Sequence, residues 1–161
     1  MIKTDSINII KQLIAFDTTS RESNMKLINY IKNYLDNLNI DSFIIYNDEG
    51  TKANLYATIG CNNTPGIMLS GHTDVVPTDG QTWDTDPFQL VKKGEKVYGR
   101  GASDMKSFIG IVLAKLPIFL SRGLKIPIHL AFSYDEEVGC IGVRRIIEKI
   151  NQLPIRPSMC I

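Results

Sequence analysis

The chain has 161 residues, of which 43% are hydrophobic and 22% charged, and its formal net charge is +1. That length is sufficient for one domain with a hydrophobic core, and the composition is ordinary for a globular protein. Because the charge is nearly balanced and no apolar stretch is long enough to cross a bilayer, we expect no nucleic acid and no membrane among its partners.

The first part of the chain is predicted to contain two helices followed by short strands. Apolar residues recur at helical spacing over 6–16 and again over 23–39. The period then changes to that of β-prone runs separated by turn-forming residues. These predicted strands occupy 42–46, 54–59 and 67–70.

The second part is predicted to alternate strands and helices. A hairpin is expected from strands at 88–91 and 96–98, followed by a buried helix at 104–120. A strand at 126–133 and an amphipathic helix at 142–150 are expected to come next. Pro117 is expected to kink or end the buried helix. Residues 157–161 resemble the start of a further strand, so the chain is expected to stop before its domain is complete. The whole pattern predicts an α/β fold, with a mixed sheet and helices on both faces.

The cysteines and the N-terminus indicate a cytoplasmic protein. Cys61, Cys140 and Cys160 are odd in number and form no Cys-x-x-Cys pattern, which is unlike a secreted disulfide framework. The N-terminus opens a charged amphipathic segment and lacks the apolar run of a signal peptide.

His72 and Asp74 form the first of three polar clusters that follow predicted strands. A histidine two residues before an aspartate, just past a buried strand, can place an imidazole in a cleft while the carboxylate fixes its tautomer. The alternative is a capped turn in which Asp74 binds backbone amides.

The second and third clusters contain the remaining candidate residues. Asp104 follows a glycine-rich segment and opens the buried helix, where an aspartate is also an ordinary helix cap. Asp135, Glu136 and Glu137 follow an apolar strand, and their mutual repulsion raises their pKa values unless a cation is present. A solvated acidic loop is the alternative for this triplet.

Together, these clusters favour a metal-dependent hydrolase. One imidazole and several carboxylates suit zinc, manganese or cobalt, and of two adjacent glutamates one can ligate while the other takes a proton from water. His129 lies within a strand pattern and is expected to be structural. Ser133 has no histidine partner in sequence, which disfavours a Ser-His-Asp triad.

At these residues the sequence resembles the M20 metallopeptidase family, and within it the acetylornithine deacetylase branch. The strongest portions are 70–77, 83–90, 97–106 and 129–142. The resemblance implies that His72 ligates the first metal, that Asp74 orients His72, and that Asp104 bridges two metals. It further implies that Glu137 ligates the second metal and that Glu136 is the general base.

The implied reaction is hydrolysis of N2-acetyl-L-ornithine to ornithine and acetate, in arginine biosynthesis. The cofactors would be two divalent ions, zinc or cobalt, and the substrate a small N-acyl amino acid. Family members are homodimers more than twice as long as this chain, and they carry a lid or dimerisation domain and further metal ligands. Residues 1–161 would then be the N-terminal part of the catalytic domain, with the metals weakly held or absent and little activity alone. The alternatives are a noncatalytic remnant or binding module, and another M20 enzyme such as succinyl-diaminopimelate desuccinylase.

Overall fold

A five-stranded mixed sheet forms the centre of the protein in a computed structural model that describes residues 6–61 and 63–161. In spatial order its strands are β1 (Ser42–Tyr46), β2 (Ala53–Ile59), β6 (Ile128–Ser133), β3 (Ile67–His72) and β7 (Met159–Cys160). Strand β3 is parallel to β6 and β7, while β2 is antiparallel to β1 and β6. The predicted mixed sheet is confirmed.

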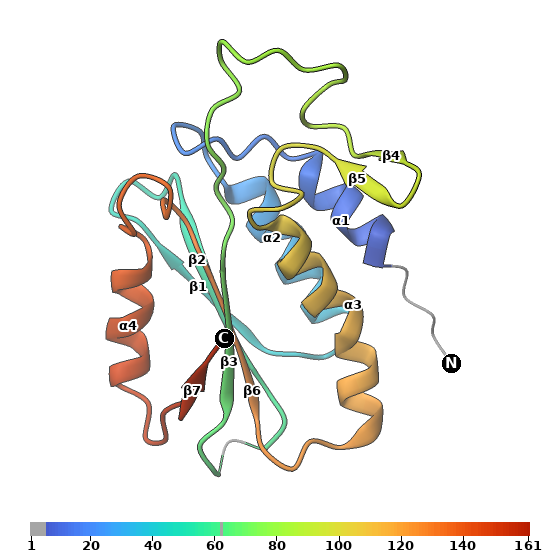
Figure 1. Ribbon diagram of the computed structural model, residues 1–161. Coiled ribbons are helices and arrows are strands. Elements are labelled where there is room, and N and C mark those ends of the chain that lie inside the picture. The colour runs from blue at the N-terminus through green and yellow to red at the C-terminus, as the bar shows by residue number, and fades with distance from the viewer. Residues whose placement is uncertain (1–5, 62) are drawn as a thin grey trace.

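Helices cover both faces of this sheet, as predicted (Figure 1). One face packs against α1 (Ser6–Ile14), α2 (Met25–Asp36) and α3 (Lys106–Arg122), and the other against α4 (Val143–Asn151). A separate two-stranded hairpin consists of β4 (Val91–Lys93) and β5 (Lys96–Tyr98). No helix in the described ranges is both long and apolar enough to cross a bilayer.

Strand β2 shows why the sheet needs cover on both sides. Successive side chains of a strand point to opposite faces. Leu55 and Ala57 join the large core beneath the three helices, whereas Tyr56 packs with Ala131 and Ile146 beneath α4. All five of these residues are buried, so both faces are removed from water.

The sequence predicts that Pro117 kinks or ends its helix; it does not end the helix, because α3 continues to Arg122. A proline inside a helix removes the hydrogen bond to the carbonyl four residues earlier. That carbonyl belongs to Leu113, and it accepts a hydrogen bond of 3.1 Å from the Tyr34 hydroxyl on α2. A neighbouring helix therefore satisfies the group that the proline leaves unpaired.

Several predicted boundaries also differ from the structure. Helix α3 begins at Lys106, so Asp104 precedes it, and the residue at the cap position, Met105, makes no side-chain capping bond. Strand β3 extends two residues further than predicted and ends at His72. The first hairpin strand begins only at Val91, because residues 86–89 form a turn in which Asp86 accepts from two backbone amides.

Gly110 permits the close crossing of α1 and α3. A methyl group at Gly110 would lie 2.5 Å from Cγ1 of Ile10. We expect Gly110→Ala to lower the free energy of unfolding by about 1–3 kcal/mol, although alanine is the better helix former. Urea denaturation would measure this loss. Lys115→Ala on the exposed side of α3 is the control, and a Gly110→Ala variant as stable as that control would contradict the predicted crowding.

Candidate metal centre

His72 occupies the last position of β3, directly opposite Ser133 at the end of β6. Because the two strands are parallel, their carboxyl ends meet at one edge and the segments that follow them converge there. The imidazole is 5% exposed. Its Nδ1 donates to the backbone carbonyl of Asp74 at 2.9 Å, and its Nε2 lies 2.9 Å from Oδ1 of Asp104.

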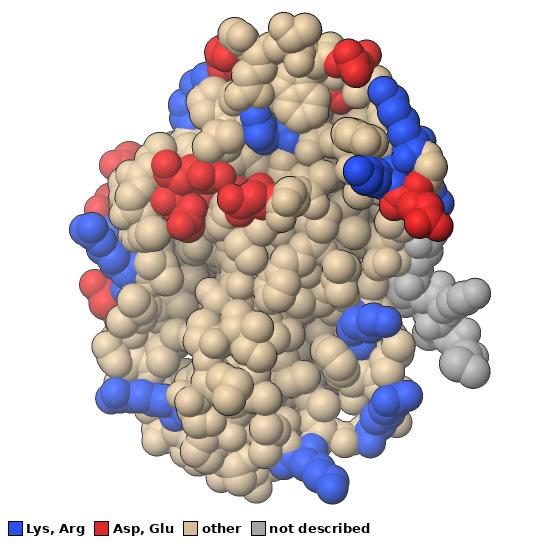
Figure 2. Space-filling model, viewed as in Figure 1, with Lys and Arg blue, Asp and Glu red and all other residues tan. Residues whose placement is uncertain are grey.

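Two glutamates complete the group around this imidazole. Oε2 of Glu136 lies 3.8 Å from Nε2 of His72. One ligand atom from each of His72, Glu136 and Glu137 lies within 4.8 Å of the others. Figure 2 shows acidic side chains gathered near the edge where β3 and β6 end. The structure thus brings together residues from three separate clusters of the sequence.

Asp74 is buried, with 2% of its surface exposed, and it contacts several other residues of the site. Its carboxylate accepts hydrogen bonds from the Ser20 hydroxyl at 2.7 Å and from the backbone amides of Glu136 at 3.0 Å and Glu137 at 3.2 Å. Oδ1 of Asp74 is 3.5 Å from Nδ1 of His72, whereas the backbone carbonyl oxygen of Asp74 is 2.9 Å from the same nitrogen. Burial raises the pKa of Asp74. The hydrogen bonds from His72, Ser20 and the two glutamate amides outweigh that effect, so the net pKa is lowered. The carboxylate therefore holds the acidic loop as well as lying beside the imidazole.

The carboxylates beside His72 favour a positive charge at this position. Burial lowers its pKa, but the side chains of Asp74 and Asp104 outweigh that effect and raise the pKa to about 9. The protonated ring donates toward both neighbours. A divalent ion on Nε2 would replace the proton that lies between the ring and Asp104, and this donor set is one that zinc or cobalt accepts.

Glu137 leads to the same conclusion. Burial raises its pKa, the charge of His72 lowers it, and the charges of Asp104 and Glu136 raise it, so that the net pKa is raised. A bound cation relieves such repulsion. Asp104 and Glu137 also line a cavity of about 210 Å³ beside Arg100 and Ser103, which leaves space for a small molecule next to the candidate ligands.

The affinity for a divalent ion should depend on pH. We expect Co²⁺ affinity to rise about tenfold per unit between about pH 6 and pH 8, because His72 must release its proton before it can ligate. Affinity rises with pH because the pKa of His72 is about 9, so below that pH most free imidazoles carry the proton that the ion must displace. Calorimetric titration at several pH values would measure the slope, and an affinity independent of pH would contradict the role of this imidazole.

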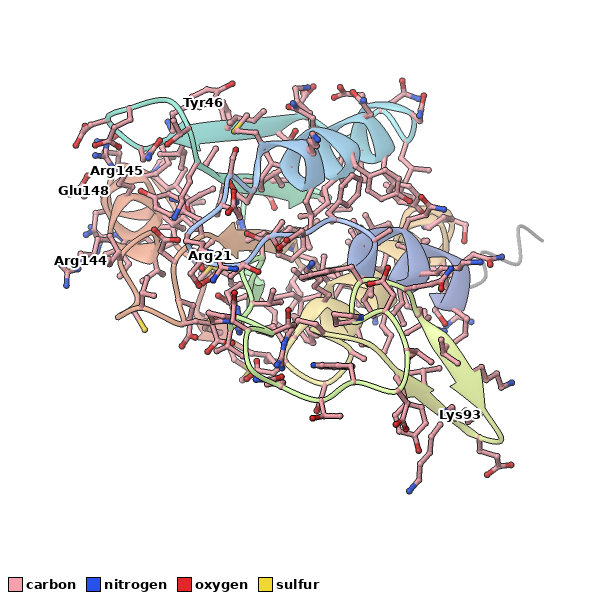
Figure 3. The ribbon with its side chains drawn as sticks, turned by 90° about the horizontal axis from the view of Figure 1, so that it is seen from above. Arg21, Tyr46, Lys93, Arg144, Arg145 and Glu148 are labelled. Carbon is pink, nitrogen blue, oxygen red and sulfur yellow. The ribbon has the colours of Figure 1, made fainter. Side chains whose placement is uncertain are left out.

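A larger cavity, of about 470 Å³, lies between α4 and the turn after β1. Figure 3 shows Arg144, Arg145 and Glu148 on this side of the protein. Arg145 is already paired with Asp48 at 2.7 Å. This cavity contains no part of the His72 group, so the chemistry of the site lies with the smaller one.

His129 is structural, as the sequence indicated. It is 1% exposed, and its Nδ1 lies 2.7 Å from the Tyr56 hydroxyl and 3.0 Å from the Thr58 hydroxyl on β2. Burial lowers its pKa. The ring therefore connects β6 to β2 within the sheet.

The sequence analysis missed Ser20 and Lys52. Ser20 lies in a segment noted only for breaking the first helical pattern, and it bonds Asp74 across 54 positions of the chain. Lys52 bonds Asp135 across 83 positions. Neither belongs to a cluster of metal-ligand residue types, so local sequence carries no signal for them.

The fold and this group of side chains are typical of metal-dependent hydrolases, in which an α/β sheet carries metal ligands at the carboxyl ends of its strands. The sequence profile of peptidase family M20/M25/M40 matches residues 68–160, more than half of the chain. The chain belongs to this family, which confirms the resemblance.

Curated relatives agree with this assignment. The acetylornithine deacetylase of Proteus mirabilis (strain HI4320) is 37% identical over 146 residues, covering 86% of this chain and 37% of that protein. That of Buchnera aphidicola subsp. Schizaphis graminum (strain Sg) is 34% identical over 154 residues, covering 92% of this chain and 40% of that protein. The chain thus spans about two fifths of the length of these relatives.

Solved structures share the fold. Human carnosine dipeptidase 1 superimposes with a TM-score of 0.83 at 20% identity, over 96% of this chain and 37% of that one. The M20 family metallo-carboxypeptidase Sso-CP2 from Sulfolobus solfataricus gives 0.82 at 24% identity, over 94% of this chain and 36% of that one.

Proposed function

We propose that this protein hydrolyses the amide bond of a small N-acyl amino acid, with N2-acetyl-L-ornithine as the first substrate to test. The observation that supports this most is the group of ligand atoms from His72, Glu136 and Glu137 within 4.8 Å, with Asp104 2.9 Å from the same imidazole. The curated relatives named acetylornithine deacetylase favour the acetyl substrate.

His72 and Asp104 would hold one divalent ion, and Asp104 and Glu137 would hold a second. Such ions, when bound, lower the pKa of water and polarise a carbonyl oxygen. Catalytic zinc normally takes three protein ligands. With Glu136 kept as the base, this assignment gives each ion two ligands, one of them shared, so we expect the 161-residue chain to hold its metals weakly.

Glu136 is the proposed general base. Its side chain is 44% exposed, so it can meet both solvent and substrate, and its Oε2 lies 3.8 Å from the imidazole that marks the site. A base must come within hydrogen-bond reach of the proton that it removes. Glu136 would take a proton from the attacking water and return it to the nitrogen of the leaving amine.

The direct test incubates the purified chain with Co²⁺ or Zn²⁺ and N2-acetyl-L-ornithine, and follows the release of ornithine. We expect slow hydrolysis that requires added metal and stops with a chelator. We expect His72→Ala to be inactive whether or not metal is added. Succinyl-diaminopimelate and a dipeptide, assayed in parallel, distinguish related substrates. Metal binding without hydrolysis of any of them would favour a binding module, and equal activity of His72→Ala would refute the proposed site.

A further inference from the structure

Lys52 lies just before β2 and joins two segments that both reach the candidate metal centre. Its Nζ is 2.6 Å and 2.9 Å from the two carboxylate oxygens of Asp135, and it also donates to the backbone carbonyl of Ser20. The side chains of Lys52 and Asp135 are only 15% and 14% exposed. This ion pair is therefore shielded from most of the solvent that weakens surface pairs.

The same two segments are joined a second time by Asp74. Ser20 donates its hydroxyl to Asp74, and the residues after Asp135, namely Glu136 and Glu137, donate their backbone amides to it. A partly buried cation, Lys52, and a buried anion, Asp74, thus hold one pair of segments at two points. Neither contact uses a side-chain oxygen of a candidate metal ligand, so both contacts can persist when ions bind.

The backbone at Asp135 explains why the acidic loop needs this support. Asp135 has a φ of +53°, in the left-handed region that residues with a side chain enter less readily than glycine. That conformation turns the chain immediately before Glu136. Asn54, two residues after Lys52, closes the base of the loop by accepting from the Tyr134 amide and donating to the Gly142 carbonyl. One end of β2 therefore supplies two supports for the loop.

We propose that Lys52 is a positioning residue for the metal centre: its contact with Asp135 sets the place of Glu136 and Glu137 relative to His72. This inference rests on the proposed function for its catalytic meaning, but the placement of the loop can be measured separately. Residues that orient ligands without touching the metal typically change its affinity about 10- to 100-fold when replaced.

The test compares Lys52→Met with Lys32→Met, which removes an equally long cation from an exposed pair with Asp36 on α2. Hydrogen exchange of the Glu136 and Glu137 amides reports the loop, with Leu130 in β6 as an internal reference. Titration with Co²⁺ alone reports the site, and the cobalt absorption spectrum reports its geometry. We expect Lys52→Met to speed exchange of the two loop amides at least about tenfold, to weaken Co²⁺ binding about 10- to 100-fold and to alter the spectrum. Lys32→Met should do none of these.

Two further variants guard against a simple loss of folding. Lys52→Arg keeps the charge and should recover most of the affinity and the parent spectrum. Asp135→Asn keeps a residue that tolerates left-handed backbone but removes the ion pair, so it should resemble Lys52→Met. Exchange and affinity in Lys52→Met equal to those in Lys32→Met would overturn the inference. If loop exchange depends on Lys52 but the parent chain and His72→Ala bind Co²⁺ equally poorly, the positioning of the loop stands and the proposed function fails.

Discussion

Glu136→Gln should lower the rate of amide hydrolysis by about 10²- to 10⁴-fold while leaving the affinity for Co²⁺ close to that of the parent chain. The amide of glutamine has nearly the shape of the carboxylate but cannot take a proton. The backbone amide of residue 136, which bonds Asp74, is untouched by the change. Steady-state kinetics at saturating metal, combined with Co²⁺ titration, would separate the loss of a base from the loss of a ligand.

Glu137→Gln is the matched control, because it makes the same change at the adjacent position of the same loop. We expect it to weaken Co²⁺ binding, so that activity returns in part as the metal concentration is raised. Glu136→Gln should not recover in this way. If the two variants exchanged these behaviours, Glu137 would be the base and Glu136 the ligand, and the roles assigned to them would be wrong.

Asp74→Ala is expected to lower the free energy of unfolding by about 3–5 kcal/mol, the largest stability effect predicted for this site. The substitution leaves the Ser20 hydroxyl and the amides of Glu136 and Glu137 without their acceptor in a buried place, and each such loss is costly. It also removes a negative charge beside His72. Urea denaturation of the metal-free chain would measure the effect without any contribution from bound ions.

Asp79→Ala is the control for this prediction. Asp79 also accepts a charged hydrogen bond, from Arg21 at 2.7 Å, but the side chain is 64% exposed. Exposed ion pairs contribute little to stability, because water and salt screen the charges. Equal losses in the two variants would mean that the bonds to Asp74 add little to the stability of the folded chain.

Hydrophobic periodicity predicted the four helices and all of the central strands, because the burial of alternate or helically spaced side chains is a local property of the sequence. The sequence left open whether Pro117 kinks or ends its helix, and the helix does not end there. Whether a proline ends a helix depends on what happens to the carbonyl that it leaves unpaired, and here the Tyr34 hydroxyl supplies the missing donor from 79 positions away. Such a partner is invisible until the two helices are packed.

Some residues of the candidate site could be predicted from the sequence, and others could not. His72, Glu136 and Glu137 were predicted because each belongs to a polar cluster that follows a predicted strand. Asp104 follows a glycine-rich segment at a predicted helix start, and its role as a metal ligand came from the family resemblance. The structure places them around one imidazole, and their roles remain predictions. Lys52 was not predicted, since a lone lysine before a strand is usually a solvated charge and its contact with Asp135 exists only in the folded chain.

The pairing of His72 with Ser133 makes the position of the imidazole depend on the register between β3 and β6. A shift of β3 by a single place against β6 would turn the imidazole to the opposite face. That face now belongs to Gly71, where even a methyl group would lie 3.1 Å from Cε of Met105 and 3.3 Å from Cδ1 of Phe108. An imidazole at the place of Gly71 would have to displace these side chains, so the crowding disfavours that misaligned sheet.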